Sequence, residues 1–216
     1  MSGGVDSSVA ALLLSEAGCE CVGATMRLFH NEDAGVSREK SCCSLEDVED
    51  ARSVAYQLGM PFYVFNFTDD FAARVIDPFV AAYRSGRTPN PCIGCNPEVK
   101  FPSLLRRADE LGARLIATGH YARCDGQNLY MGNPDNDQSY MLARLRPEQV
   151  SRLLLPLGAY QKKRVREMAA EMGLRVAGKP DSRENCFIRG QTYAEWLESR
   201  AAMPGPGAAR LGDEVI

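Results

Sequence analysis

Some residue types and segment types are scarce in this sequence, and their scarcity narrows what the chain can be. It holds only two histidines, and it has no second Cys-x-x-Cys pair beside Cys92 and Cys95. A closed zinc site needs four ligands, so a structural zinc site is disfavoured. No apolar run approaches the ~20 residues of a membrane-spanning helix, and no basic stretch followed by an apolar segment marks a secretory leader. We therefore expect a cytoplasmic protein with no membrane segment.

A strong excess of positive charge is also missing, because the net charge is −3. Any nucleic-acid site must therefore be a local patch. Cysteine, by contrast, is abundant, with eight residues in a chain of 216. Their spacing does not resemble a small secreted disulfide scaffold. Reactive or metal-binding thiols are the favoured interpretation, with inert thiols as the alternative.

Strand-like and helix-like patterns alternate along the chain. A buried strand is expected at residues 21–26 and further strands at 62–67 and 115–118, and Asp125-Gly126 predicts a hairpin. Helical spacing of apolar residues predicts helices at 7–16, 44–58, 71–83 (interrupted at Pro78), 104–111 and 163–172. Such alternation is typical of a Rossmann-like α/β fold, in which helices cover both faces of a parallel sheet.

The run Ser2-Gly3-Gly4-Val5-Asp6-Ser7-Ser8 stands where a strand should pass into a helix. Gly3 and Gly4 permit a close approach that a Cβ atom would block, and the first amides of the helix then point at an anion. Ser7 and Ser8 add hydroxyl donors, and Asp6 can hold Mg²⁺ beside the phosphates. A glycine turn with a serine-rich cap is the alternative. The complete run favours a phosphate site, and it resembles the PP-loop of ATP pyrophosphatases.

Both ends of the pattern look incomplete. Only Met1 precedes the loop, so the first strand of the sheet is expected to be missing. Near the other end, the linker-like run Pro204-Gly205-Pro206-Gly207 is followed by too few residues to fold alone. We expect a PP-loop ATP-binding and catalytic domain at residues 1–190. Residues 191–216 would then begin a truncated central domain.

A second chemical motif is Thr88-Pro89-Asn90-Pro91-Cys92-Ile93-Gly94-Cys95-Asn96. Its prolines stiffen the approach, and the spacing of Cys92 and Cys95 directs both thiols into one small volume. Half of a zinc site or a buried thiol pair is the alternative. A distant third cysteine, Cys186, follows the polar, turn-prone stretch Lys179-Pro180-Asp181-Ser182, which should expose it.

Together these motifs closely resemble the bacterial tRNA-specific 2-thiouridylases, and the resemblance extends almost over the whole chain. It includes the loop, the Cys92 motif with Lys100-Phe101, residues 116–123, residues 137–140, residues 155–158 and Cys186-Phe187-Ile188. The resemblance implies an adenine nucleotide alpha hydrolase-like fold, and it implies that the domain at residues 1–190 includes a helical part that binds tRNA. Relatives of full length carry two further β domains, which are expected to be lacking here.

The resemblance also implies a role for each matching position. Cys95 would be the nucleophile, and Cys186 would carry a persulfide. The nine ATP-binding residues would be Ser2, Gly3, Gly4, Val5, Asp6, Ser7, Ser8, Met26 and Gly119. The tRNA-binding residues would be Asn90, Pro91, Cys92, His120, Asn136, Asp137 and Gln138.

The reaction implied is ATP-dependent thiolation of tRNA. ATP and Mg²⁺ would activate C2 of the wobble uridine by adenylation, and sulfur from the Cys186 persulfide would then give 2-thiouridine, AMP and pyrophosphate. The expected partners are tRNA and a sulfur donor protein, either a cysteine desulfurase or a sulfur carrier.

Several alternatives stay open at this point. Cys92 stands where some relatives have aspartate, so Cys92, Cys95 and Cys186 are also candidate ligands of a [4Fe-4S] cluster with one open iron position. Cys42-Cys43 is either a pair of spare thiols in a loop or has a role in sulfur relay or cluster binding. An amide-forming ligase of the same superfamily needs no thiol, and the cysteines argue against it. A non-catalytic RNA- or metal-binding fragment leaves the glycine loop unexplained.

Overall fold

The computed structural model describes residues 1–29, 42–180, 185–188, 191–201, 203, 207–208, 210–212 and 214–215. The predicted turn at Asp181-Ser182 and residues 204–206 of the predicted linker lie outside this part. Cys42 and Cys43 begin a helix rather than lying in the expected loop.

The α-helices are α1 (Val5–Glu16), α2 (Cys42–Gln57), α3 (Thr68–Phe71), α4 (Asp77–Arg84), α5 (Pro91–Cys95), α6 (Phe101–Glu110), α7 (Pro147–Val150), α8 (Lys162–Glu171) and α9 (Tyr193–Arg200). The strands are β1 (Gly23–Arg27), β2 (Phe62–Asn66), β3 (Ile116–Ala117), β4 (Ala122–Cys124), β5 (Leu129–Met131), β6 (Leu153–Leu154), β7 (Arg210–Leu211) and β8 (Glu214–Val215). Short 3₁₀ turns occur at Pro134–Asn136, Ser139–Leu142 and Arg175–Gly178.

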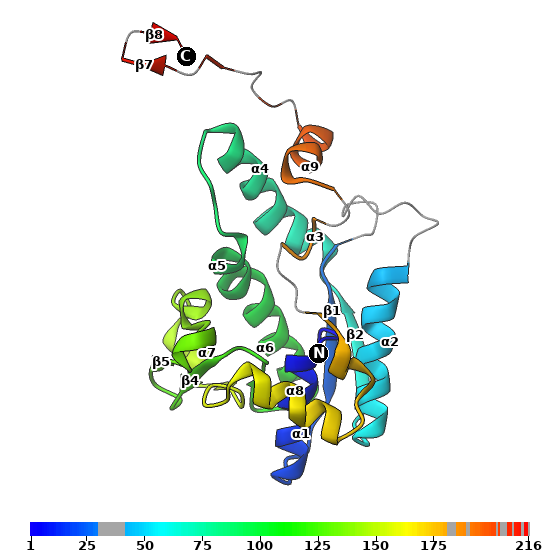
Figure 1. Cartoon of the computed structure of the whole chain (residues 1–216). Helices are drawn as coiled ribbons and strands as arrows, with labels where there is room; N and C mark the ends of the chain where they lie inside the picture. Colours follow the sequence, from blue (N-terminus) through cyan, green and yellow to red (C-terminus); the bar gives the residue numbers. More distant parts are fainter. Residues whose placement is uncertain are drawn as a thin grey trace.

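Two parallel strand pairs form the centre of the fold. β1 pairs with β2 and β3 pairs with β6, whereas β4 and β5 form the predicted antiparallel hairpin around Asp125-Gly126. A further short hairpin joins β7 to β8. α2 lies on one side of the β1–β2 pair, and α5 and α6 lie on the other (Figure 1). The predicted α/β class with helices on both faces is therefore confirmed.

β1 and β3 do not pair with each other in the described part of the chain, and the space between them is an open cleft. Met1 is the residue next to β1: its amino group donates a hydrogen bond to the Ala24 carbonyl, and its own carbonyl accepts one from the Thr25 hydroxyl at 2.7 Å. No described strand fills this space, so the described parallel strands form two separate pairs.

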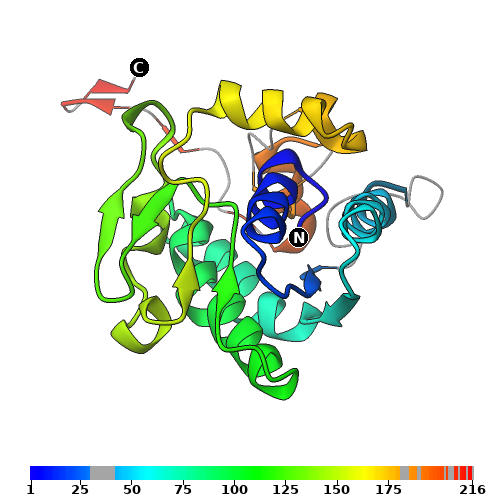
Figure 2. The ribbon, with the colours of Figure 1, turned by 90° about the horizontal axis from the view of Figure 1, so that it is seen from below.

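A first core cluster attaches α1 to its neighbours. Val5 and Val9 of α1 pack against Val54 of α2 and Val165 of α8, all buried. Seen from below, α1 lies between α2 and α8 (Figure 2). The helix that begins at the glycine loop is therefore held from two sides.

A second cluster is aromatic and joins distant parts of the chain. Phe79 of α4 contacts Phe187 at a ring separation of 5.3 Å and Trp196 of α9 at 6.0 Å, both with edge-to-face geometry. Such pairs add to the stabilisation from burial. Cys95 is buried in the same cluster, so the segment that carries Cys186 is anchored beside the Cys92 motif.

The helices that contain Pro78, Pro91 and Pro102 adjoin π-helical turns. A π-helical turn at Ala72–Ile76 precedes α4, so the expected interruption at Pro78 takes the form of a π turn just before it. A second π turn, Asn96–Lys100, joins α5 to α6 and contains Pro97. Proline has no N–H to donate to the carbonyl four residues earlier, and a π turn shifts the helical hydrogen bonds beside it to the residue five positions back. Such turns are frequent at functional sites. No helix in the described ranges has the length and hydropathy needed to cross a bilayer.

Candidate functional site

The glycine loop is preformed by hydrogen bonds among its own residues. The Ser2 amide donates to the Ser7 hydroxyl at 3.0 Å, and the Ser8 hydroxyl donates to the Gly4 carbonyl at 2.9 Å. Gly3 has φ +74°, a conformation that favours glycine. Gly4 is the N-cap of α1 and provides no side chain, so side chains do not occupy the first amides of the helix. This is the arrangement that binds an anion at a helix N-terminus.

The end of β3 lies directly against this loop. A Cβ atom placed on Gly119 would come within 2.8 Å of the Asp6 carbonyl carbon and of the Ser7 nitrogen. These are backbone atoms that cannot move aside cheaply. The absence of a side chain at Gly119 therefore allows the close approach of the predicted ATP-binding residues.

Asp6 is already neutralised by a cation from another helix. Lys162, the first residue of α8, lies 2.7 Å from each carboxylate oxygen of Asp6, and the Tyr121 hydroxyl donates to one of them at 2.7 Å. The predicted Mg²⁺ ligand thus has both oxygens engaged by protein donors. A metal ion at Asp6 does not fit this arrangement unless Lys162 moves.

A second lysine connects the loop to α2. The Lys179 ammonium donates to the Gly3 carbonyl at 3.1 Å, to Asp47 at 2.6 Å and to Asp50 at 2.8 Å. Burial alone would lower the pKa of Lys179, but Asp47 and Asp50 raise it overall. Arg166 in turn donates to the Lys179 carbonyl at 2.9 Å. The Gly3 turn is therefore held to α2 and α8.

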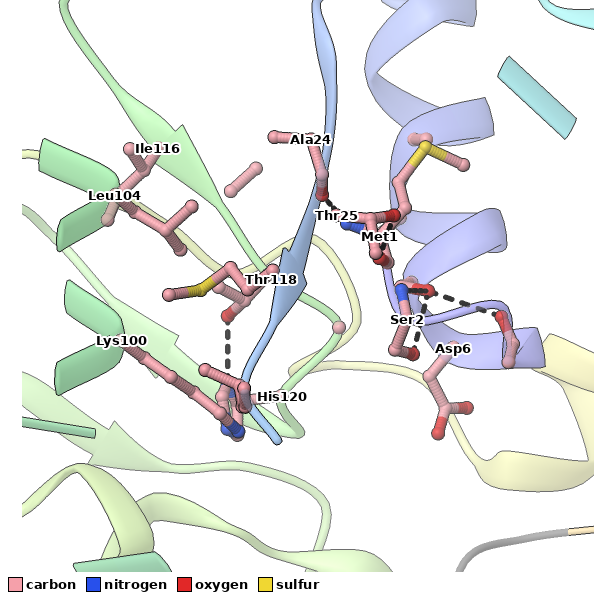
Figure 3. A pocket seen from close by; sticks show the side chains of 18 of the residues that line it. Met1, Ser2, Asp6, Ala24, Thr25, Lys100, Leu104, Ile116, Thr118 and His120 are labelled. Atoms are coloured by element: carbon pink, nitrogen blue, oxygen red, sulfur yellow. Dashed lines mark hydrogen bonds between the residues drawn. The ribbon is translucent and has the colours of Figure 1, made fainter. Parts of the chain in front are cut away.

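One large cleft, with a volume of about 1980 Å³, opens between β1, the glycine loop and the end of β3. Figure 3 shows Ser2 and Asp6 on one side of it, with Thr118, His120 and Lys100 opposite. Nearly all predicted site residues line this cleft: Ser2, Gly4, Val5, Asp6, Ser7, Met26, Asn90, Pro91, Cys92, Gly119, His120, Asn136, Asp137, Gln138 and Cys186. Gly3, Ser8 and Cys95 are buried beneath its surface. Residues predicted for ATP, sulfur and tRNA thus share one site.

The three cysteines of the site differ in exposure. Cys186 is exposed and Cys92 is half-buried, whereas Cys95 is only 4% exposed. Burial raises the pKa of Cys95 to about 12, opposed by the nearby positive charge of Lys100 and reinforced by Cys186 and Cys92. These mutual effects place the three sulfurs in one neighbourhood. In this arrangement Cys95 is a protonated thiol, and Cys92 and Cys186 are the ones open to the cleft.

Lys100 is a buried cation that acts electrostatically on all three thiols. Burial alone would lower the pKa of Lys100, but the neighbouring Cys95, Cys186 and Cys92 raise it overall. Its charge also acts on His120, whose pKa burial and Lys100 together lower to about 3. The Thr118 hydroxyl contacts His120 Nδ1 at 2.8 Å. His120 is therefore a neutral imidazole at the edge of the cleft.

The predicted tRNA-binding stretch 136–138 divides into two kinds of residue. Asp137 and Gln138 have structural partners: Asp137 accepts from the Gly132 amide at 2.7 Å, and Gln138 accepts from the Tyr121 amide at 3.1 Å. Asn136 differs, because its side-chain nitrogen and oxygen are buried and have no hydrogen-bond partner in the part of the chain that the structure describes. A buried amide without partners is costly. Asn136 is thus the one of the three whose side chain has no hydrogen-bond partner among the described residues.

No group of three or more histidine, cysteine or acidic side chains is arranged to hold a metal ion in the described ranges. Cys92, Cys95 and Cys186 lie near one another, but their side chains are not arranged so that all three could bind one metal ion. The cluster predicted as an alternative therefore does not fit these positions as they stand.

Three residues at the site gain a role only from the structure. Tyr121 and Lys162 hold Asp6, and Lys179 holds Gly3. Lys162 is 156 residues from Asp6, and Lys179 is 176 residues from Gly3. No pattern in the sequence links residues so far apart. The glycine and cysteine motifs could be predicted because each lies within a few consecutive residues.

Comparison with known proteins places this site in a family. A family model described as the tRNA methyl transferase HUP domain matches residues 1–190. The chain belongs to this family. Its similarity to curated members extends over most or all of its length. A protein of Geobacter metallireducens called tRNA-specific 2-thiouridylase MnmA is 48% identical over 100% of the chain. One of the same name from Cutibacterium acnes is 51% identical over 93% of it.

The chain spans about 60% of the length of the Geobacter relative and 56% of the Cutibacterium one. Among solved structures, NMN synthetase from Francisella tularensis is similar, with a TM-score of 0.53 and 18% identity. That similarity covers 90% of this chain and 68% of the synthetase, and it concerns the fold alone. The fold of this chain therefore also occurs in an enzyme with a different name.

Proposed function

We propose that this chain carries the adenylation and sulfur-transfer site of a tRNA 2-thiouridylase. The observation that carries the proposal is the shared cleft: the phosphate-binding end of α1 and the thiols of Cys92 and Cys186 line the same space. ATP activation and sulfur delivery to one atom require such proximity. The family model is named for methyl transfer, but the curated relatives are named for thiolation, and the three thiols favour the second chemistry.

In the first step the C2 oxygen of a tRNA uridine attacks the α-phosphorus of ATP, and pyrophosphate leaves. The amides of residues 5–7 at the start of α1 bind the phosphates and neutralise developing charge. Met26 and Gly119, which line the cleft at the ends of β1 and β3, flank the adenosine. Mg²⁺ would arrive bound to ATP, and Asp6 would not be its ligand.

In the second step a persulfide on Cys186 attacks C2. A carbon–sulfur bond forms, the bond from C2 to the AMP oxygen breaks, and AMP leaves. A second thiol then attacks Sγ of Cys186, which releases the thiolated base and leaves a disulfide for an external thiol to reduce. Cys95 is assigned this second role. Since its pKa is about 12 here, it must lose its proton when substrate fills the cleft.

Exposure of Cys186 suits its role, because a sulfur donor protein must reach it. Asn90, Pro91 and Cys92 lie against the target base in this proposal, and Asn136 with His120 contacts the tRNA beside it. The buried, unpartnered amide of Asn136 supports that contact, since a nucleobase edge offers both a donor and an acceptor.

Isotope exchange between pyrophosphate and ATP, with and without tRNA, tests the first step. Exchange that depends on tRNA supports the proposal, whereas exchange driven by a small carboxylic acid would indicate a ligase. An iron–sulfur cluster on Cys92, Cys95 and Cys186 would be a different route to the same product. Anaerobic reconstitution with iron and sulfide, followed by an optical spectrum, separates the two, because an active colourless protein excludes the cluster route.

A further inference from the structure

We propose that Lys162 is a nucleotide-binding residue: its ammonium, positioned by Asp6 and Tyr121, binds the phosphate chain of ATP at the start of α1. This inference rests on the proposed function, because it assigns a partner to the phosphates that the glycine loop would bind. It also gives Asp6 a different role, as the residue that positions a cation rather than a ligand of Mg²⁺.

The geometry gives Lys162 a defined place at the loop. Its nitrogen lies 2.7 Å from both oxygens of Asp6 and 5.5 Å from the centre of the Tyr121 ring. Tyr121 also donates to Asp6, so three side chains from three segments form one unit. Lys162 lines the cleft together with Ser2, Gly4 and Ser7 of the loop.

The electrostatics require a cation at this position. Asp6 stands in the first turn of α1, where the phosphates of ATP would bind. A lone carboxylate there would repel a nucleotide that carries several negative charges. Lys162 cancels that repulsion, and with 26% of its side chain exposed it also presents charge to the cleft. An ammonium has three donor hydrogens on a flexible stem and commonly binds phosphate as a point charge.

The position of Lys162 in the fold keeps its charge at the loop. It is the first residue of α8, and Val165 and Ala169 of that helix are fully buried against α1. Movement of α8 would therefore break part of the core. The ammonium is held close to the phosphate end of α1 before any nucleotide arrives, which lowers the cost of ordering it on binding.

The test compares Lys162→Met with Lys163→Ala in titrations of ATP and of adenosine. Methionine keeps the apolar stem over Tyr121 and removes only the charge, and Lys163 is an exposed lysine on the same turn of α8. We expect Lys162→Met to weaken ATP binding at least about tenfold, which corresponds to about 1.4 kcal/mol. Its adenosine affinity should stay close to wild type, because adenosine has no phosphates for the ammonium to bind. Lys162→Arg should restore part of the ATP affinity.

A second pair of variants tests the role of Asp6. If Asp6 positions Lys162, adding Asp6→Asn to Lys162→Met should strengthen ATP binding, because the repulsive carboxylate is gone. If Asp6 is instead a Mg²⁺ ligand, the added change should weaken binding, and excess Mg²⁺ should rescue Asp6→Asn; that outcome overturns the inference. Equal ATP affinities of Lys162→Met and Lys163→Ala would also overturn it. A wild-type chain that binds no ATP would refute the proposed function and this inference together.

Discussion

Lys179 donates a hydrogen bond from its ammonium to the carbonyl oxygen of Gly3 across 3.1 Å. The same ammonium contacts Asp47 and Asp50 of α2. A single side chain thus joins the glycine loop to a helix and to the segment that leads toward Cys186. Loop geometry should therefore depend on a residue that does not touch ATP.

The first prediction concerns this link. Lys179→Ala removes a cation from two partly buried carboxylates, Asp47 and Asp50, and such losses cost about 1–3 kcal/mol. We expect a lower free energy of unfolding in urea together with weaker ATP binding, because Gly3 is released. Arg164→Ala is the control, since it removes an exposed ion pair on α8 with Glu171 and should change stability little. A Lys179→Ala variant as stable as the control would contradict the role of this link.

A second prediction concerns Gly119. Its Cβ position lies 2.8 Å from backbone atoms of Asp6 and Ser7, so Gly119→Ala must push β3 away from the loop. Overpacking of this kind costs typically about 1–3 kcal/mol, and ATP binding should weaken as well. Gly94→Ala provides the matched control for stability, because a Cβ atom there meets nothing within 4 Å. If both variants unfold at the same urea concentration, the close approach at Gly119 does not affect the free energy of unfolding.

The third prediction follows from the neutral state of His120. The folded imidazole has a pKa of about 3, against 6.5 when unperturbed. Between these values the unfolded chain binds a proton that the folded chain rejects, so stability is lost as pH falls below about 6.5. Lowering the pH from 7 to 5 should cost about 2 kcal/mol through this residue.

His120→Gln isolates that effect. The variant has no titrating ring at this position, so its unfolding free energy should fall less between pH 7 and pH 5 than that of wild type. Acidic residues elsewhere affect both proteins alike. Parallel pH profiles for the two would show that His120 titrates normally in the folded chain.

The fourth prediction concerns the reactivity of the cysteines. Cys186 is exposed and Cys92 half-buried, whereas Cys95 is buried with a pKa of about 12. Since the thiolate is the reactive form, iodoacetamide should alkylate Cys186 and Cys92 at least about tenfold faster than Cys95. Peptide mass spectrometry after short exposures measures all three at once. Alkylation of Cys95 as fast as Cys186 in the folded chain would contradict the buried placement.

The sequence predicted much of this structure because its strongest patterns are local. The helix after the glycine loop, the strand at 62–66 and the hairpin at Asp125-Gly126 follow from spacing and turn chemistry over a few residues. The motifs around Cys92 and Cys186 identified residues that prove to line one cleft. Their assignment to one site needed the family resemblance, because nothing in the spacing from 92 to 186 fixes a distance.

Other features depend on packing between distant segments and could not be read from the chain. The burial of Cys95 results from the aromatic cluster of Phe79, Phe187 and Trp196, which comes from three parts of the sequence. The pairing of Lys162 with Asp6 likewise depends on how α8 packs beside α1. The sequence offered Asp6 as a metal ligand because its neighbours in the chain are phosphate-binding residues. It could not show that a lysine already occupies both oxygens.

The most direct measurement of the central claim is nucleoside mass spectrometry of tRNA incubated with the chain, ATP, Mg²⁺ and a persulfide donor. The account predicts 2-thiouridine in amounts that match the AMP formed, and its loss in Cys186→Ser while ATP binding persists. Full thiolation of tRNA by Cys186→Ser would contradict the account.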